Sequence, residues 1–386
     1  MPGGNGDSRA ARAALLERTG DRLELVDDLR VEAPREGEVR VRITHCGVCH
    51  SDLHILDGSI SFPLPVVPGH EAAGVVDRVG EGVRHLAEGD RVVLTCRPPC
   101  GACYWCVRGE EFLCSASTAW ATGMLADGTT RLERGGRPVY RGVGVGGFAE
   151  YVTTDANGAI AVPSDTPLDI AAVLGCAVQT GVGAVLNAAR VQPGDTVLVV
   201  GLGGVGICIV QGARIASAAK IFGVDPVAAR REQAARFGLS HALDPAAGDV
   251  AETVLELTGG IGVDHAVDAV ASPATTAQCL AATRAGGSIV LVGVAEEGDV
   301  VSIPSRAYVG ESKRLIGSFV GSANPHRQFG LYLDLWKEGR LALDDLVTAV
   351  RPLDQVNEAF DDLRTATGLR TVLAVSDDAA DYARGA

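Results

Sequence analysis

The chain has 386 residues and carries 48 acidic against 34 basic side chains, so its formal net charge at pH 7 is −14. Proteins that bind nucleic acid or an anionic membrane present a basic face, and this balance argues against both kinds of partner. Hydrophobic residues make up 47% of the chain, but no uninterrupted apolar stretch reaches the ~18 residues of a membrane-spanning helix.

The first third of the chain is predicted to be rich in strands. Residues 1–12 are polar and Gly-rich, without the apolar core of a secretory signal, and are expected to form a flexible leader. Short apolar runs at 38–43 and 74–79 lie between turn residues, which is typical of strands. A β-rich domain is therefore expected over residues 1–177.

Strands and helices alternate from about residue 178. The predicted strands are the apolar runs 196–200, 221–224, 265–270 and 288–292, and the predicted helices include 207–219 and 228–237. Such alternation indicates a parallel sheet with helices on both faces. We therefore predict an α/β domain over residues 178–320.

The alternation ends near residue 320. Segments 328–338 and 353–363 have the pattern of amphipathic helices, residues 370–375 read as a last strand, and residues 376–386 read as a loose tail. The simplest layout inserts the α/β domain into a β-rich domain that is completed by residues 321–386.

Four cysteines lie close together in the segment 97–115, at positions Cys100, Cys103, Cys106 and Cys114. Four thiolates can close a tetrahedron around Zn²⁺ and leave no open position, which defines a structural site. An Fe–S cluster uses the same ligands, and a zinc ribbon that binds nucleic acid is a second alternative, which the acidic composition disfavours. Without a signal peptide, such crowding indicates metal binding rather than disulfides.

A second set of metal-binding side chains is spread along the chain. Cys49, His70 and Cys176 supply two thiolates and one imidazole, and three protein ligands with one open position are typical of catalytic zinc. Each alone reads as a buried thiol or a core histidine. Together with the four-cysteine cluster they predict a catalytic zinc site. The other thiols expected to be buried and unligated are Cys46, Cys208 and Cys279.

The run GLGGVG at 201–206 follows an apolar strand and precedes a helix, which is the context of a dinucleotide-binding loop. Its members are Gly201, Gly203, Gly204, Val205 and Gly206. Asp225 ends the next strand, about 20 residues further on, where a carboxylate holds ribose hydroxyls and repels a 2′-phosphate. This favours NAD over NADP. Alternatively Asp225 only makes the turn before Pro226, and Arg230 either offsets the preference or lies beside the ribose.

The motifs CHSDLH, GHEAAG, GCAVQTG, GLGGVG, GVDP and LRTVLAV, together with the cysteine cluster, occur in one order from about residue 14 to 375. In this order they resemble the zinc-containing medium-chain alcohol dehydrogenases. The resemblance implies a GroES-like β-rich catalytic domain with an inserted Rossmann domain, two Zn²⁺ per subunit and NAD. It also implies an alcohol or aldehyde substrate and a cytoplasmic enzyme. The long segment 115–147 resembles the usually dimeric members, so a homodimer is expected.

The same resemblance assigns roles to single residues. Cys49, His70 and Cys176 match the catalytic zinc ligands, and the four clustered cysteines match the structural zinc site. Ser51 matches the hydroxyl that bonds the substrate oxygen, and His54 matches the outer end of the proton relay. The supporting carboxylates are Asp52, which orients His70, and Glu71.

The cofactor and substrate positions follow from the same resemblance. His50 and Arg370 match pyrophosphate contacts, and Thr180 and Val205 match positions beside the nicotinamide. The predicted pocket residues are Ile60, Cys96, Gly142, Val143, Phe319 and Val294, the last of which is also assigned to the cofactor site. Cys96 and Gly142 are small, which predicts a roomy apolar pocket for a medium-chain or aromatic alcohol.

The chain departs from the family pattern at two positions. Gln179 stands where many members carry a smaller residue, and His50 stands where many long members carry arginine. Two other functions remain open: a dehydrogenase whose tightly bound NAD(H) is recycled by a second substrate, and a relative that binds zinc and nucleotide without catalysing a reaction.

Overall fold

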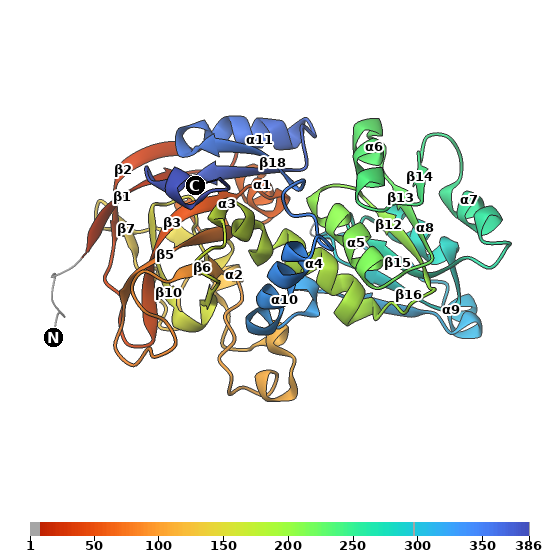
Figure 1. The fold of residues 1–386 in the computed structure, drawn as a ribbon, viewed down its shortest axis with the longest axis horizontal. Coiled ribbons are helices and arrows are strands. Elements are labelled where there is room, and N and C mark those ends of the chain that lie inside the picture. Colours follow the sequence, from red (N-terminus) through yellow and green to blue (C-terminus); the bar gives the residue numbers. More distant parts are fainter. Residues whose placement is uncertain (1–7, 296–297, 386) are drawn as a thin grey trace. The chain divides into compact units, whose positions relative to one another are not determined.

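The computed structural model describes residues 8–295 and 298–385, which form two compact units (Figure 1). Unit 1 comprises Met1–Cys176, Asn324–Leu331 and Leu343–Ala386, and unit 2 comprises Ala177–Ala323 and Tyr332–Ala342. The helix α10 (Pro325–Lys337) contributes to both. Each unit is built around its own sheets.

Unit 1 is dominated by a seven-stranded sheet in the order β11-β6-β5-β3-β19-β18, with β10 also paired to β3. Its strands are β3 (Glu38–Gly47), β5 (Glu71–Val79), β6 (Arg91–Leu94), β10 (Tyr151–Asp155), β11 (Ala159–Ala161), β18 (Val347–Pro352) and β19 (Arg370–Ala374). Its helices are α1 (His50–Asp57), α2 (Ala119–Thr122), α3 (Leu168–Ala171) and α11 (Val356–Arg364).

A smaller sheet in unit 1 has the order β1-β2-β7-β8. Its strands are β1 (Arg9–Leu15), β2 (Glu24–Val31), β7 (Leu132–Arg134) and β8 (Arg137–Pro138), and a separate pair joins β4 (Val66–Val67) to β9 (Tyr140–Arg141). The segment 115–147 thus adds the hairpin β7-β8 to the edge of β2, an element that its polar sequence did not reveal.

The register between β3 and β5 brings the last residue of β3 next to the first residue of β5. Val39, Val41 and Ile43 are fully buried along β3, as expected for alternate residues on the inner face of a sheet. The antiparallel register pairs Gly47 with Glu71. The chain leaving β3 and the chain entering β5 therefore lie side by side.

The described residues near both ends of the chain are more ordered than their composition predicts. The leader was expected to reach residue 12, but Arg9–Leu15 pairs with β2 as strand β1, and residues 1–7 lie outside the described part. The C-terminal tail was expected to be loose, which is wrong. Arg384 donates to Asp169, which is only 2% exposed, and Arg42 contacts both Asp378 and Tyr382. Ion pairs, which hydropathy does not detect, hold the tail.

Unit 2 is a six-stranded parallel sheet in the order β14-β13-β12-β15-β16-β17, with helices packed along it (Figure 1). The strands are β12 (Thr196–Val200), β13 (Lys220–Val224), β14 (His241–Leu243), β15 (Val263–Asp268), β16 (Thr283–Leu291) and β17 (Arg314–Gly317). The helices are α4 (Ala177–Gly183), α5 (Gly204–Ile215), α6 (Ala228–Arg236), α7 (Val250–Leu257), α8 (Pro273–Ala282) and α9 (Ser305–Glu311).

Strand β15 of unit 2 ends earlier than predicted. The apolar run suggested a strand to residue 270, whereas β15 ends at Asp268. The Asp268 carboxylate accepts hydrogen bonds from the N–H groups of Val270 and Ala271. This local turn draws the backbone out of the sheet.

Among the described residues, no single helix is long and apolar enough to cross a membrane. One bent pair of helices, Leu168–Gly175 with Ala177–Ala189, is together long and apolar enough to cross a membrane. Most of its residues are buried within the fold.

Candidate functional site

The end of β3 and the start of β5 bring together the predicted ligands in unit 1. One ligand atom from each of Cys49, His70, Glu71 and Cys176 lies within 4.8 Å of all the others. The Nε2 atom of His70 is 3.3 Å from the sulfur of Cys176. Tetrahedral zinc with one sulfur and one nitrogen ligand separates those two atoms by about 3.5 Å. The donor set and its spacing therefore fit Zn²⁺.

Asp52 fixes the orientation of His70. Its Oδ1 lies 3.0 Å from Nδ1 of His70 and accepts a hydrogen bond from the backbone N–H of Gly69 at 2.9 Å. Asp52 is fully buried in the first turn of α1. Because the carboxylate holds Nδ1, the ring presents Nε2 toward Cys176, as a metal-ligating histidine does.

Cys49 immediately precedes α1 and lies against two other members of the set. Hydrogen bonding with Cys176, and then with His70, lowers the pKa of Cys49 well below that of an ordinary thiol. The thiolate is the form that binds metal. The site therefore favours the ligand form of Cys49.

Glu71 is buried within the same set, and Arg370 faces it. Arg370 Nη1 lies 3.4 Å from Oε1 of Glu71 and donates to the carbonyl of Val48 at 2.9 Å. Burial raises the pKa of Glu71 to about 8, although the charge of Arg370 opposes this rise. Because its carboxylate belongs to the same group of ligand atoms, Glu71 is close enough to act as a fourth ligand. Arg370 holds the loop that leads to Cys49 through its bond to Val48.

The predicted proton relay lies along α1. Ser51 and His54 are partly exposed, and His50 is exposed. The rings of His50 and His54 are 6.5 Å apart. The Nδ1 atom of His54 is buried and has no hydrogen-bond partner within the described residues. This nitrogen therefore has an unused hydrogen-bonding capacity in the described structure.

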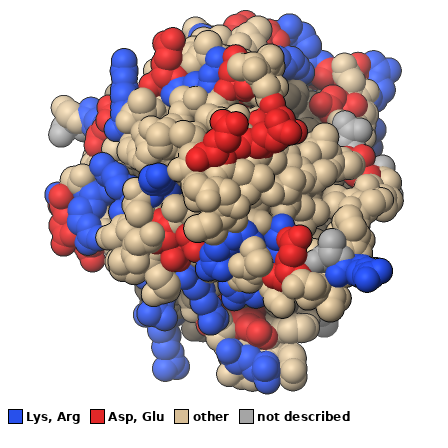
Figure 2. Space-filling view, turned by 90° about the vertical axis from the view of Figure 1, so that its right-hand side faces the viewer, with Lys and Arg blue, Asp and Glu red and all other residues tan. Residues whose placement is uncertain are grey.

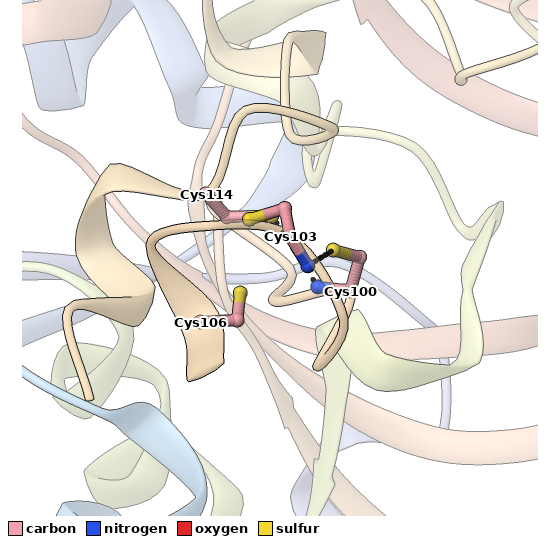
Figure 3. A group of neighbouring side chains, drawn as sticks. All are labelled: Cys100, Cys103, Cys106 and Cys114. Carbon is pink, nitrogen blue, oxygen red and sulfur yellow. Dashed lines mark hydrogen bonds between the residues drawn. The ribbon is translucent and has the colours of Figure 1, made fainter. Parts of the chain in front are cut away.

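The four clustered cysteines converge in one loop of unit 1, which Figure 3 shows. The sulfurs of Cys103 and Cys114 are 3.9 Å apart, close to the ~3.8 Å edge of a tetrahedral zinc–thiolate site. Hydrogen bonds from the backbone of Cys106, and then of Ser115, lower the pKa of Cys103 to about 5. The backbone N–H of Cys100 also donates to the sulfur of Cys114. The cluster fits a closed zinc site.

Unit 2 carries the predicted phosphate loop between β12 and α5. Gly201 has a φ of +88°, and a side chain on Gly206 would place Cβ 1.8 Å from the carbonyl oxygen of Gly201. A Cβ on Gly203 would instead meet nothing within 4 Å. Helix α5 begins at Gly204 without a side-chain cap. The open space before uncapped N–H groups fits a pyrophosphate.

Asp225 follows β13 and faces this loop. Its carboxylate accepts hydrogen bonds from the N–H groups of Leu202 at 2.9 Å and Val227 at 2.8 Å. Nη1 of Arg230 lies 3.7 Å from the same carboxylate. Asp225 therefore forms the turn, as one of the two interpretations predicts, and also ties it to the phosphate loop, whereas its role toward a ribose stays a prediction.

The remaining predicted residues are distributed over both units. In unit 1, Cys96 and Gly142 are buried and Ile60 and Val143 are partly buried; in unit 2, Thr180, Val205 and Phe319 are partly buried and Val294 is exposed. Cys46, Cys208 and Cys279 are fully buried, as predicted. No functional role was predicted for Asn187 or for the turn after β17, because neither belongs to a recognisable sequence motif.

Two family models match the chain. The alcohol dehydrogenase GroES-like domain matches residues 35–164, and the zinc-binding dehydrogenase model matches residues 204–338. The chain is 38% identical to the putative alcohol dehydrogenase D of Mycobacterium tuberculosis, over 94% of this chain and 98% of that protein. It is 37% identical to the NDMA-dependent alcohol dehydrogenase of Amycolatopsis methanolica, over 95% and 99%.

A solved structure shares the whole fold. The benzyl alcohol dehydrogenase of Acinetobacter calcoaceticus superposes with a TM-score of 0.90 at 29% identity, covering 95% of this chain and 100% of that one. The chain belongs to the zinc-containing medium-chain alcohol dehydrogenase family. The α/β fold class, with GroES-like and Rossmann domains, and the family's oxidoreductase activity are thereby confirmed.

Proposed function

We propose that the chain is a zinc-dependent dehydrogenase that transfers a hydride between a primary or secondary alcohol and NAD, giving an aldehyde or ketone. The convergence of Cys49, His70 and Cys176 carries this proposal. The proposed catalytic zinc supplies Lewis-acid polarisation of the substrate oxygen when bound, and NAD supplies the hydride acceptor. The four-cysteine cluster would hold a second, structural zinc ion.

The remaining steps are proton transfers and positioning by the chain itself. We assign Ser51 to accept the hydroxyl proton and His54 to pass it to solvent, which suits the partly exposed position of both residues on α1 and the unpartnered Nδ1 of His54. Asp52 keeps the imidazole of His70 in one tautomer. Arg370 pairs with Glu71 and thereby competes with any bond from that carboxylate to the metal.

For the cofactor, we assign the pyrophosphate to the loop 201–206, with further contacts from His50 and Arg370. Asp225 would meet the adenosine ribose, which favours NAD. The nicotinamide would lie beside Thr180 and Val205. The uncapped start of α5 supports the placement of the pyrophosphate at this loop.

We propose an aromatic or medium-chain alcohol as substrate because Cys96 and Gly142 are small and the pocket residues are apolar. The similarity to a benzyl alcohol dehydrogenase supports this choice. In an NAD-linked screen of alcohols with zinc measured on the same sample, kcat/KM for benzyl alcohol should exceed that for ethanol by at least ~10-fold, since each additional buried apolar group contributes to transition-state binding. A preference for ethanol would contradict the assignment.

The same screen separates the alternative functions. The relative named for NDMA dependence favours the version in which NAD(H) stays bound and a second substrate recycles it. Absorbance of NADH in the purified chain, with turnover on NDMA but none on added NAD, would establish that version. Complete inactivity of fully zinc-loaded protein on all substrates would favour a non-enzymatic relative.

We also propose a homodimer in a reducing compartment such as the cytoplasm, which suits six ligand thiolates. Strand β17 lies at an edge of the sheet of unit 2, and Val300 and Val309, which precede it in the chain, are about three-quarters exposed. Figure 2 shows broad uncharged areas between the acidic and basic side chains of the face that it presents. Light scattering should give the mass of two chains; a monomer at micromolar concentration would contradict this proposal.

A further inference from the structure

The turn that follows β17 has an unusual backbone. Val320, Gly321 and Ser322 all have positive φ values, at 43°, 70° and 49°. Only glycine adopts this region without steric cost, and a β-branched valine is especially disfavoured. Strained residues persist where the surrounding structure holds them, and they concentrate at ligand sites.

Helix α4 and the helical turn after it hold this backbone in place. Nε2 of Gln179 donates to the carbonyl of Val320 at 3.1 Å, and Nδ2 of Asn187 donates to the carbonyl of Gly321 at 2.9 Å. A Cβ on Gly183 would lie 2.4 Å from the carbonyl oxygen of Gly321. The turn is therefore pressed against α4, and one amide side chain from α4 and one from the helical turn after it hold it there.

Gln179 is only half satisfied in this arrangement. The residue is 1% exposed, and its Oε1 has no hydrogen-bond partner within the described residues. The donor to Val320 defines which end of the amide carries nitrogen. A buried carbonyl oxygen without a partner lowers stability. Stability alone therefore gives no reason for glutamine at this position, whereas control of the turn does.

We propose that Gln179 is a positioning residue for the nicotinamide end of the cofactor site, an inference that rests on the proposed function. Gln179 directly precedes Thr180, the residue assigned to the nicotinamide, and it fixes the carbonyl of Val320 in the adjoining turn. The same turn follows Phe319, which is assigned to the substrate pocket. Gln179 thus lies beside the residue assigned to the nicotinamide and helps to hold the turn next to the residue assigned to the substrate pocket.

The test compares NADH with ADP-ribose, which lacks the nicotinamide. In calorimetric titrations of the full-length chain, Gln179→Met should raise the Kd for NADH about tenfold, the effect of losing one well-placed hydrogen bond. The Kd for ADP-ribose should stay within about twofold. The melting temperature should fall less than in a variant that only unpairs a backbone group, because the substitution leaves the carbonyl of Val320 unpaired but also removes an unpartnered acceptor. Gln179→Ser, which shortens the side chain, should weaken NADH in the same way.

Gln211 provides the matched control. It is a fully buried glutamine of α5 in unit 2, and its Oε1 accepts the N–H of Ala342 at 2.7 Å. Gln211→Met should lower the melting temperature, because it leaves that N–H unpaired, but should not change the ratio of the two dissociation constants.

The outcomes are separable. Unchanged NADH binding in both Gln179 variants, or equal weakening of NADH and ADP-ribose, would overturn the positioning role while leaving the proposed function intact. A wild-type chain that binds neither ligand after any bound NAD(H) has been removed would overturn the cofactor assignment and this inference together.

Discussion

Replacing Cys176 by serine is expected to reduce kcat/KM by on the order of 10³-fold or more and to lower the zinc content from about two ions per subunit to about one. A serine hydroxyl does not ionise near neutral pH, so the substitution leaves only Cys49 and His70 with Glu71. Lewis-acid stabilisation of the substrate oxygen contributes several kcal/mol to such reactions, and a tenfold rate change corresponds to about 1.4 kcal/mol. Steady-state kinetics with metal analysis of the same sample provides the measurement.

Cys279→Ala serves as the control for this experiment. Cys279 is a fully buried thiol of α8 in unit 2, and it belongs to neither candidate ligand set. Its loss should cost some stability through lost packing, with zinc content unchanged. If Cys176→Ser kept both zinc ions and wild-type turnover, the assignment of the three ligands would be wrong.

The sequence predicts best where burial and local turns agree. Residues 196–200 form β12 with the predicted bounds, because an apolar run that is bounded by Gly and polar turn residues has few other stable conformations. The next helix, α5, starts at Gly204, three residues before the predicted start. The prediction began later because glycines have poor intrinsic helix propensity, even where the fold places them in a helix. The predicted bounds of helices and strands are wrong where tertiary packing determines the backbone conformation.

The candidate metal sites were predictable because their chemistry is visible in residue type and spacing. The four cysteines lie within one short loop, so sequence proximity already implies spatial proximity. The side chains that surround the other candidate metal site were less predictable from the sequence. The pairing of Arg370 with Glu71 depends on β19 and β5 flanking β3 in one sheet, and a pairing between strands so far apart along the chain leaves no local pattern.

The contacts of unit 2 show the same limit. Gln179 could be recognised as unusual, but its bond to Val320 spans 141 residues and depends on three successive left-handed residues. Asp225 was predicted to be a ribose ligand or a turn residue, and its carboxylate accepts hydrogen bonds from backbone N–H groups of both the turn and the phosphate loop. One acidic side chain serves several hydrogen bonds, which a motif does not represent.

Replacing Ser51 by alanine should lower kcat by about 10²- to 10⁴-fold, the usual contribution of a positioned proton acceptor, while the zinc content stays unchanged. Ser51 lies in the first turn of α1, next to the buried Asp52, and no hydrogen bond in the described structure requires its hydroxyl for folding. The loss should therefore appear in turnover and not in the melting temperature.

Ser59→Ala is the matched control for Ser51. The Ser59 hydroxyl donates to Asp57 at 2.7 Å beyond the C-terminal end of the same helix, so its removal should cost a little stability and leave kcat within about twofold. Near-full activity in Ser51→Ala would show that the hydroxyl proton leaves by another route. A parallel loss of zinc would instead show that Ser51 acts on the metal site, since an effect confined to proton transfer leaves Cys49, His70 and Cys176 in place.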